Sequence, residues 1–183
     1  MEPTEYRSVD PASGELQARF AIATDTDLEQ AIIRSAKAFD DWRRQPLASR
    51  IGLIARAAEL LESKAAELAQ TMATEMGKPV AEGRAEAEKC AWVCRYYAEN
   101  AEQFLSDSPR ESDGSAAWVR YDPLGPIVAV MPWNFPFWQF FRFAAPALIA
   151  GNAILLKHSP NTPRCALAIE ALMKEAGTPE ALV

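Results

Sequence analysis

Residues 128–157 read VAVMPWNFPFWQFFRFAAPALIAGNAILLK, and this stretch is the most informative about the architecture of the chain. An apolar run ends on Pro-Trp-Asn-Phe-Pro, a segment of helix length follows, and Gly151-Asn152 precedes a second apolar run that ends at Lys157. This order predicts two parallel strands joined by a helix. Ligands of doubly wound parallel sheets bind beyond the carboxyl ends of the strands, so Asn134 and Lys157 are expected to face one cleft.

The residues before this unit predict a pair of strands and then a helix. Residues 1–24 are expected to form an arm of two strands around a turn that ends at Gly14. The first helix is expected to open on a capping box formed by Thr26-Asp27-Leu28-Glu29. Its buried face is expected to consist of Leu28, Ala31, Ile32, Ser35, Phe39 and Trp42.

Further helices are expected before and after the central unit in the sequence. One runs from about residue 47, bends near Ser63 and ends at Gly77-Lys78-Pro79. Others are expected over 80–105 and 163–176, with a short strand at 116–121 after a polar loop. The fold class is therefore α/β, with a layer of long helices and a parallel sheet that stays incomplete, because the chain stops where a third strand should begin.

Composition and charge exclude several classes of protein. The chain has 183 residues, 49% of them hydrophobic and 24% charged, which is typical of a globular protein. The net charge of −6 and the absence of a basic stretch argue against nucleic-acid binding. Prolines and Arg142 interrupt the apolar run 128–157, so it is not expected to cross a membrane. Three cysteines without framework spacing and a start without signal-peptide features favour a cytoplasmic protein.

Two polar side chains in the central unit are candidates for chemistry. Asn134 lies between Pro132 and Pro136, which stiffen the segment, and aromatic neighbours are expected to exclude water. Its amide is either a turn residue or a donor aimed at a developing oxyanion. Arg142 stands in an otherwise apolar helix, and its guanidinium is expected to be buried near this site. Its partner is either an acidic residue elsewhere in the chain or the carboxylate of a substrate.

The remaining candidates have weaker signals. Lys157 is either a solvated lysine at the end of a strand or a ligand for hydroxyl or phosphate groups. Cys90 and Cys94 share one helix face, but the single histidine, His158, cannot complete a metal site with them, so buried apolar thiols are expected. Cys165 opens a helix, a position that can lower a thiol pKa. No metal site and no glycine-rich dinucleotide motif is predicted.

The motif Val130-Met131-Pro132-Trp133-Asn134-Phe135-Pro136, followed by Pro146-Ala147-Leu148, Gly151-Asn152 and Leu155-Leu156-Lys157, resembles the aldehyde dehydrogenase superfamily. Upstream, the turn 9–15, the Trp42-Arg43 helix end and Gly77-Lys78-Pro79 are similar to it as well. The resemblance covers essentially all 183 residues. It implies the N-terminal part of a Rossmann-like NAD(P)-binding domain over 25–183, preceded by the arm 1–24.

Members of this superfamily oxidise aldehydes to acids with NAD or NADP through a cysteine thiohemiacetal. The resemblance implies that Asn134 is the oxyanion-hole amide and that Arg142 holds the far carboxylate of succinate semialdehyde, as in the semialdehyde dehydrogenases. It places Phe135 and Trp138 with Arg142 in the substrate site. The residues implied for the cofactor are Met131, Pro132, Trp133, Lys157, Ser159 and Pro160.

Two departures from the family pattern carry consequences. Pro160 stands where strict NAD users often have a glutamate, so either NAD or NADP is expected. The chain ends before the family's nucleophilic cysteine and general-base glutamate, so it is expected to be an N-terminal fragment that is inactive alone. The alternative is a stand-alone binding or oligomerisation module without catalytic activity. Residues 112–123 resemble the start of the hairpin through which family members form dimers or tetramers.

Overall fold

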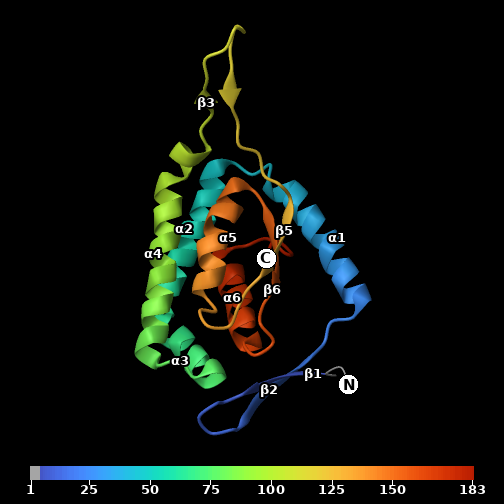
Figure 1. The fold of residues 1–183 in the computed structure, drawn as a ribbon, viewed down its shortest axis with the longest axis vertical. Coiled ribbons are helices and arrows are strands. Elements are labelled where there is room, and N and C mark those ends of the chain that lie inside the picture. Colours follow the sequence, from blue (N-terminus) through green and yellow to red (C-terminus); the bar gives the residue numbers. More distant parts are fainter. Residues whose placement is uncertain (1–4) are drawn as a thin grey trace.

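Two parallel strands and the helix between them lie at the centre of the molecule (Figure 1). The computed structural model describes residues 5–183, and in it β5 (Pro126–Val130) and β6 (Ala153–Lys157) pair in parallel. The crossover is α5 (Trp138–Ala150). Val130 is opposite Lys157, and the amide of Met131 donates to the carbonyl of Lys157 at 3.1 Å, so both strands end at the same edge. The predicted β-α-β unit is confirmed.

Long helices cover the α5 side of this pair. They are α2 (Leu47–Ser63), α3 (Ala65–Met76) and α4 (Val80–Leu105), and α5 packs against α2 and α4. The expected bend near Ser63 is a break at Lys64, and Gly77 ends α3 with a φ of +74°, a conformation that suits glycine. The largest fully buried side chains are Leu53, Ile54, Leu61, Met72, Phe137, Phe140, Phe141, Leu148, Ile154, Ile169, Leu172 and Met173.

Helix α1 (Asp25–Trp42) lies on the other side of β5 and β6 from α4 (Figure 1). The expected capping box at residues 26–29 is wrong: Thr24 is the N-cap, accepting from the amide of Asp27 at 3.2 Å while Asp27 accepts from the amide of Thr24 at 2.9 Å. The expected buried face is wrong at Leu28 and Ile32, which are 56% and 48% exposed. Helix α1 contacts β5 and β6, and no further layer of the described residues covers the part of α1 that carries Leu28 and Ile32.

Two hairpins lie outside the central body. The arm is an antiparallel pair, β1 (Glu5–Val9) and β2 (Leu16–Ala21), and its first four residues lie outside the described part of the chain. The strand expected at 116–121 is only β4 (Trp118–Val119), which pairs with β3 (Ser108–Pro109) within the segment expected to be a loop. This second hairpin projects from the end of α4 (Figure 1).

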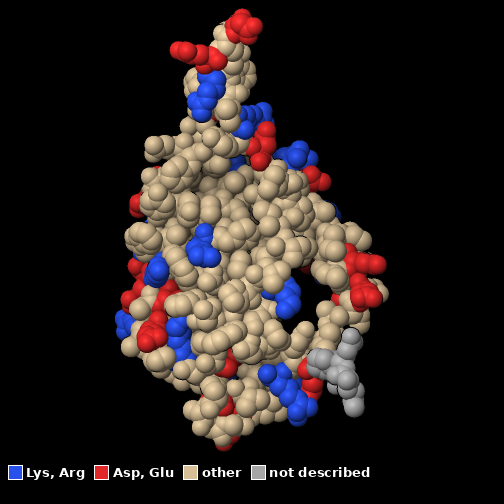
Figure 2. Space-filling model, in the orientation of Figure 1, with Lys and Arg blue, Asp and Glu red and all other residues tan. Residues whose placement is uncertain are grey.

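In the parallel sheet, one face of β5 is exposed, and within residues 5–183 the outer edge of β6 is covered only by the last residues of the chain. Val128 and Val130 of β5 are 65% and 70% exposed. On the far edge of β6, the amide of Ile154 donates to the carbonyl of Leu182 at 2.8 Å, after α6 (Pro163–Ala176) has brought the chain back. Figure 2 shows charged side chains scattered singly or in small groups on one face, with a broad uncharged area between them.

Candidate active site

The Pro-Trp-Asn-Phe-Pro motif lies in the motif loop (residues 131–137), which leaves β5 at its carboxyl end and enters α5. Asn134 is exposed, and its side-chain amide makes no hydrogen bond with any residue of 5–183. Trp133 and Phe135 are 49% and 44% exposed. The expectation that the aromatic neighbours exclude water from Asn134 is therefore wrong for the described chain, because Trp133 and Phe135 lie partly in solvent.

A buried ion pair holds the motif loop from the helical layer. Lys78, in the turn between α3 and α4, pairs with Glu86 of α4, and the two residues are only 7% and 4% exposed. The Lys78 ammonium also donates to the backbone carbonyl of Asn134 at 3.0 Å. It lies 3.9 Å from the centre of the Phe135 ring, within the range of a cation–π contact. One ammonium thus contacts two consecutive residues of the motif loop.

Glu86 also caps the helix that follows the motif loop. Its Oε1 accepts from the amides of Phe137 and Trp138 at 2.9 and 3.0 Å. Helix α5 has no cap from its own side chains, and the first amides of a helix need acceptors. A carboxylate also suits the positive end of the helix dipole. Glu86 therefore fixes where α5 begins while its other oxygen binds Lys78.

After Lys78 and Glu86, a third side chain that holds the motif loop, His158, comes from the loop after β6. His158 is buried, and its Nδ1 accepts from the amide of Ser159 at 2.8 Å, so the ring proton is on Nε2. Nε2 donates to the carbonyl of Pro136 at 3.0 Å, and the Thr162 hydroxyl lies 3.0 Å from Nδ1. Burial lowers the pKa of His158 below its usual 6.5, which keeps the ring neutral in this role. His158 thereby ties the loop after β6 to the motif loop.

Arg142 lies one turn after Trp138 on α5, and the structure corrects one expectation about it. It is exposed rather than buried, and no residue of 5–183 forms a hydrogen bond or ion pair with its guanidinium. The exposed position follows from the face it occupies, since the buried side of α5 consists of Phe140, Phe141 and their helical neighbours. Arg142 is therefore free to bind an external carboxylate.

A small pocket opens beside Phe135 and Trp138. It has a volume of about 240 Å³ and is bounded on the α4 side by Glu82, Glu86 and Lys89. The Lys89 ammonium lies 4.1 Å from the centre of the Trp138 ring. Phe135 and Trp138, both expected in the substrate site, are thus brought together at one opening.

The residues expected to bind the cofactor lie at the carboxyl ends of the two strands. Lys157 is exposed at the end of β6, and its ammonium has no partner within residues 5–183, so the donor is available to ribose hydroxyls. Pro160 is exposed and carries no charge that would repel a 2′-phosphate. The N-terminus of α6 does not fit a phosphate, because buried Glu75 already accepts from the amides of Arg164 and Cys165, each at 2.7 Å. The described residues therefore fit the ribose of NAD(P), whereas the N-terminus of α6 is not available to bind the pyrophosphate.

Comparison with known proteins decides the family. A model described as "Aldehyde dehydrogenase family" matches residues 1–183. The chain belongs to the aldehyde dehydrogenase family. The α/β fold expected from the motif is confirmed, because a solved succinic semialdehyde dehydrogenase and a solved aldehyde dehydrogenase superpose on almost the whole chain.

Individual relatives agree with this assignment. The probable succinate-semialdehyde dehydrogenase [NADP(+)] of Synechocystis sp. is 45% identical over 173 residues, and succinate-semialdehyde dehydrogenase [NADP(+)] 1 of Mycobacterium tuberculosis is 48% identical over 176 residues. Each alignment covers 94% of this chain and 38% of the relative. The structure of succinic semialdehyde dehydrogenase from Streptococcus pyogenes, in complex with NADP+, superposes with a TM-score of 0.93 at 34% identity, covering 97% of this chain and 39% of that chain.

The cysteines of this aldehyde dehydrogenase chain are all buried. Burial raises the pKa of Cys94 to about 12 and that of Cys90 well above its usual 9.0. The suggestion that the helix start lowers the pKa of Cys165 is wrong: burial and the neighbouring carboxylate of Glu75 raise it. Glu75 occupies the helix end that would otherwise stabilise a thiolate. All three thiols are thus buried, and the pKa of each is raised.

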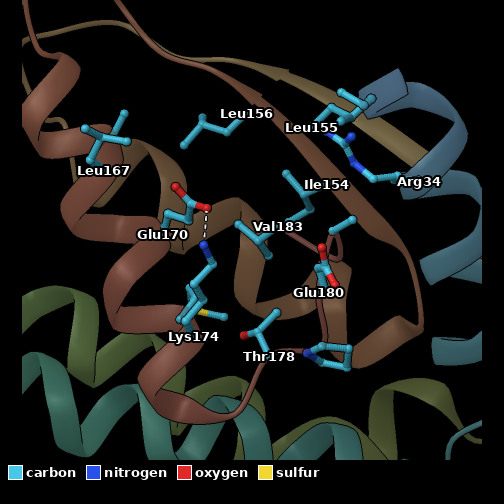
Figure 3. Close-up of a pocket in the computed structure, with 15 residues that line it drawn as sticks. Arg34, Ile154, Leu155, Leu156, Leu167, Glu170, Lys174, Thr178, Glu180 and Val183 are labelled. Atoms are coloured by element: carbon cyan, nitrogen blue, oxygen red, sulfur yellow. Dashed lines mark hydrogen bonds and ion pairs between the residues drawn. The ribbon is translucent and has the colours of Figure 1, made fainter. Parts of the chain in front are cut away.

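A second, larger pocket contains none of the expected site residues. It has a volume of about 420 Å³ and lies between α1, β6, α6 and the last residues of the chain (Figure 3). Leu155 and Leu156 border it on one side, and Glu170 and Lys174 form an ion pair of 2.5 Å at its other side. It follows the edge of β6 that Leu182 begins to cover, so it belongs to the sheet and not to the motif loop.

Reasoning from sequence missed the residues that hold the motif loop. In the sequence, Lys78 stands out only as part of a helix stop, Glu86 has no distinguishing signal, and His158 is considered only as a metal ligand. Within residues 5–183 no group of three metal-ligating side chains is found, and none of the described helices is long and apolar enough to cross a membrane. The available sequence signal was a lysine and a glutamate eight residues apart, which is weak.

Proposed function

We propose that this chain forms the oxyanion-donating part of an NAD(P)-dependent aldehyde dehydrogenase that oxidises a semialdehyde carboxylate, with succinate semialdehyde as the substrate. The observation that carries this proposal is the motif loop, which three buried side chains hold while the amide of Asn134 stays unbonded within the described residues. A donor that is fixed through its backbone and free at its side chain suits the stabilisation of a developing oxyanion. The named relatives support the choice of substrate.

In this proposal the residues of the chain have separate tasks. Asn134 donates a hydrogen bond to the aldehyde oxygen as negative charge develops on it. Arg142 binds the distant carboxylate, and Phe135 and Trp138 form the apolar wall between the two ends of the substrate. Bidentate contact with a guanidinium orients a carboxylate as well as attracting it.

The cofactor binds at the carboxyl ends of β5 and β6. Lys157 contacts the ribose hydroxyls, with Ser159 and Pro160 beside it, and Met131, Pro132 and Trp133 line the path toward the nicotinamide. When bound, NAD(P) supplies the hydride acceptor. The uncharged Pro160 and the relatives named for NADP(+) favour NADP, whose 2′-phosphate meets no carboxylate at this position.

The chain of residues 1–183 does not oxidise aldehydes by itself in this proposal. The covalent route needs a thiolate, and each cysteine of the chain is buried with a raised pKa. The nucleophile and base come from the remainder of a longer protein, in which the hairpin of β3 and β4 takes part in subunit association. Steady NADPH formation at 340 nm by the 183-residue chain alone would refute this part of the proposal.

Replacing Arg142 in the complete enzyme tests the substrate. Loss of a charge-assisted hydrogen bond costs about 1.5 to 3 kcal/mol, so Arg142→Ala should raise KM for succinate semialdehyde roughly 10- to 100-fold. KM for butanal, which has no carboxylate, should change less than about twofold. Arg95→Ala, which removes an arginine whose ion pair with Glu62 is exposed, is the matched control. Equal changes for both aldehydes would show that Arg142 does not bind the carboxylate.

A further inference from the structure

We infer that Lys78 and Glu86 are positioning residues for the amide of Asn134, an inference that rests on the function proposed above. Lys78 acts by holding the backbone carbonyl of Asn134, and Glu86 acts by holding Lys78 and the first amides of α5. Neither residue touches the substrate in this role. They set the direction from which the Asn134 side chain leaves the backbone.

The hydrogen bonds of the loop show how this works. The carbonyl of Asn134 is held by Lys78, the carbonyl of Pro136 by His158, and the amides of Phe137 and Trp138 by Glu86. Backbone groups that follow Asn134 in the sequence are therefore held one after another. Because φ and ψ determine where a side chain points, fixing the peptide after residue 134 limits where its amide can reach.

The ammonium of Lys78 is matched to this task. It has three N–H donors, and three groups surround it: the Glu86 carboxylate, the Asn134 carbonyl at 3.0 Å and the Phe135 ring at 3.9 Å. Taking both ions of such a pair out of water is costly, and a protein with apolar side chains in their place is often as stable. Stability is therefore a weak reason for a buried lysine and glutamate here. Control of the loop geometry is a function that apolar residues cannot supply.

A double-mutant cycle in the complete enzyme tests the inference, with succinate semialdehyde and NADP+ at saturation. The variants are Asn134→Ala, Lys78→Met and the double variant, and kcat is measured for each. Asn134→Ala should lower kcat about 100-fold or more, as for other oxyanion donors. Lys78→Met should lower kcat about tenfold, with KM for NADP+ within about twofold of the parent value. In the Asn134→Ala background, Lys78→Met should change kcat less than about twofold, because the group it positions is gone.

Controls separate this role from folding. Lys64→Met removes a lysine from an exposed pair with Glu175 and should leave kcat unchanged. If Lys78→Met does not fold, the cycle is run with Lys78→Gln, which keeps a polar partner for Glu86 but has a shorter reach toward the Asn134 carbonyl. The same non-additivity is expected: a lower kcat in the parent background and little change in the Asn134→Ala background.

The outcomes are distinct. An equal loss of kcat from the Lys78 substitution in both backgrounds would overturn the positioning role and leave the oxyanion role of Asn134 standing. A normal kcat for Asn134→Ala would instead overturn the proposed function itself. A change confined to KM for NADP+ would show that Lys78 acts on the cofactor side, which also contradicts the inference.

Discussion

Glu86→Ala should be one of the most destabilising substitutions in this chain. Glu86 is 4% exposed, pairs with a lysine that is 7% exposed, and accepts hydrogen bonds from two backbone amides at the start of α5. Alanine removes the negative charge and both acceptors at once. The Lys78 ammonium then stays buried with only a carbonyl and an aromatic ring as neighbours.

The size of the effect follows from these contacts. Removing one partner of a buried ion pair costs about 3 to 5 kcal/mol, mostly because the other charge remains buried. Each amide left without an acceptor adds about 1 kcal/mol, unless water enters the space and replaces the carboxylate. We expect the free energy of unfolding to fall by about 4 kcal/mol, since partial entry of water offsets part of the sum. For a slope near 2 kcal/mol per molar urea, the unfolding midpoint moves down by about 2 M.

The assay is urea unfolding followed by circular dichroism at 222 nm, with Glu88→Ala as the matched control. Glu88 lies two residues further along α4 and pairs with Arg84 at 3.0 Å, but the two side chains are 51% and 65% exposed. Its removal should change the free energy of unfolding by less than about 0.5 kcal/mol. Similar losses of unfolding free energy for Glu86→Ala and Glu88→Ala would contradict this prediction, because burial of the ion pair would then have no bearing on the cost of removing it.

Two further predictions concern thiol reactivity and pH. A thiol reagent such as dithiobis-nitrobenzoate at pH 8 should label none of the three cysteines in the folded chain and all three in urea, because burial raises the pKa of each. Rapid labelling without denaturant would contradict the buried positions. In the folded state the pKa of His158, the single histidine, lies below 6.5, so below that pH the unfolded state binds more protons than the folded state. The free energy of unfolding should therefore fall as the pH drops below 6.5, by up to about 1.4 kcal/mol per pH unit. Comparison of urea unfolding at pH 7.5 and 6.0 measures this, and a slope that persists in His158→Gln would assign the effect to other groups.

The parts of the fold that sequence predicted correctly depend on local patterns. The ends of the helices at Gly77 and Gly151 follow from the left-handed conformation that glycine adopts easily, with φ of +74° and +102°. Helix α4 spans Val80–Leu105, as its apolar repeat predicts. The order of apolar run, helix and apolar run around residue 134 was sufficient for the parallel pair.

The errors arise where a choice depends on the rest of the chain. Thr24 and Thr26 both precede acidic residues, and local sequence did not show that Thr24 would be the cap. The exposure of Leu28 and Ile32 could not be foreseen, because a helical stripe predicts burial only where another layer covers it. Arg142 was expected to be buried because its neighbours are apolar, but it lies on the side of α5 that no described element covers.

The contacts that hold the motif loop could not be predicted from local sequence, because they join residues that are far apart along the chain. Lys78 is 56 residues from Asn134 in the sequence, Glu86 is 51 from Phe137, and His158 is 22 from Pro136. Each comes from a different element, so the loop takes this shape only when the α3–α4 turn, α4 and the end of β6 have all assembled. All three elements lie within residues 5–183. The geometry of the proposed oxyanion donor is therefore specified within residues 5–183, and in the proposed enzyme the groups that attack the aldehyde need only be brought to a loop that is already held.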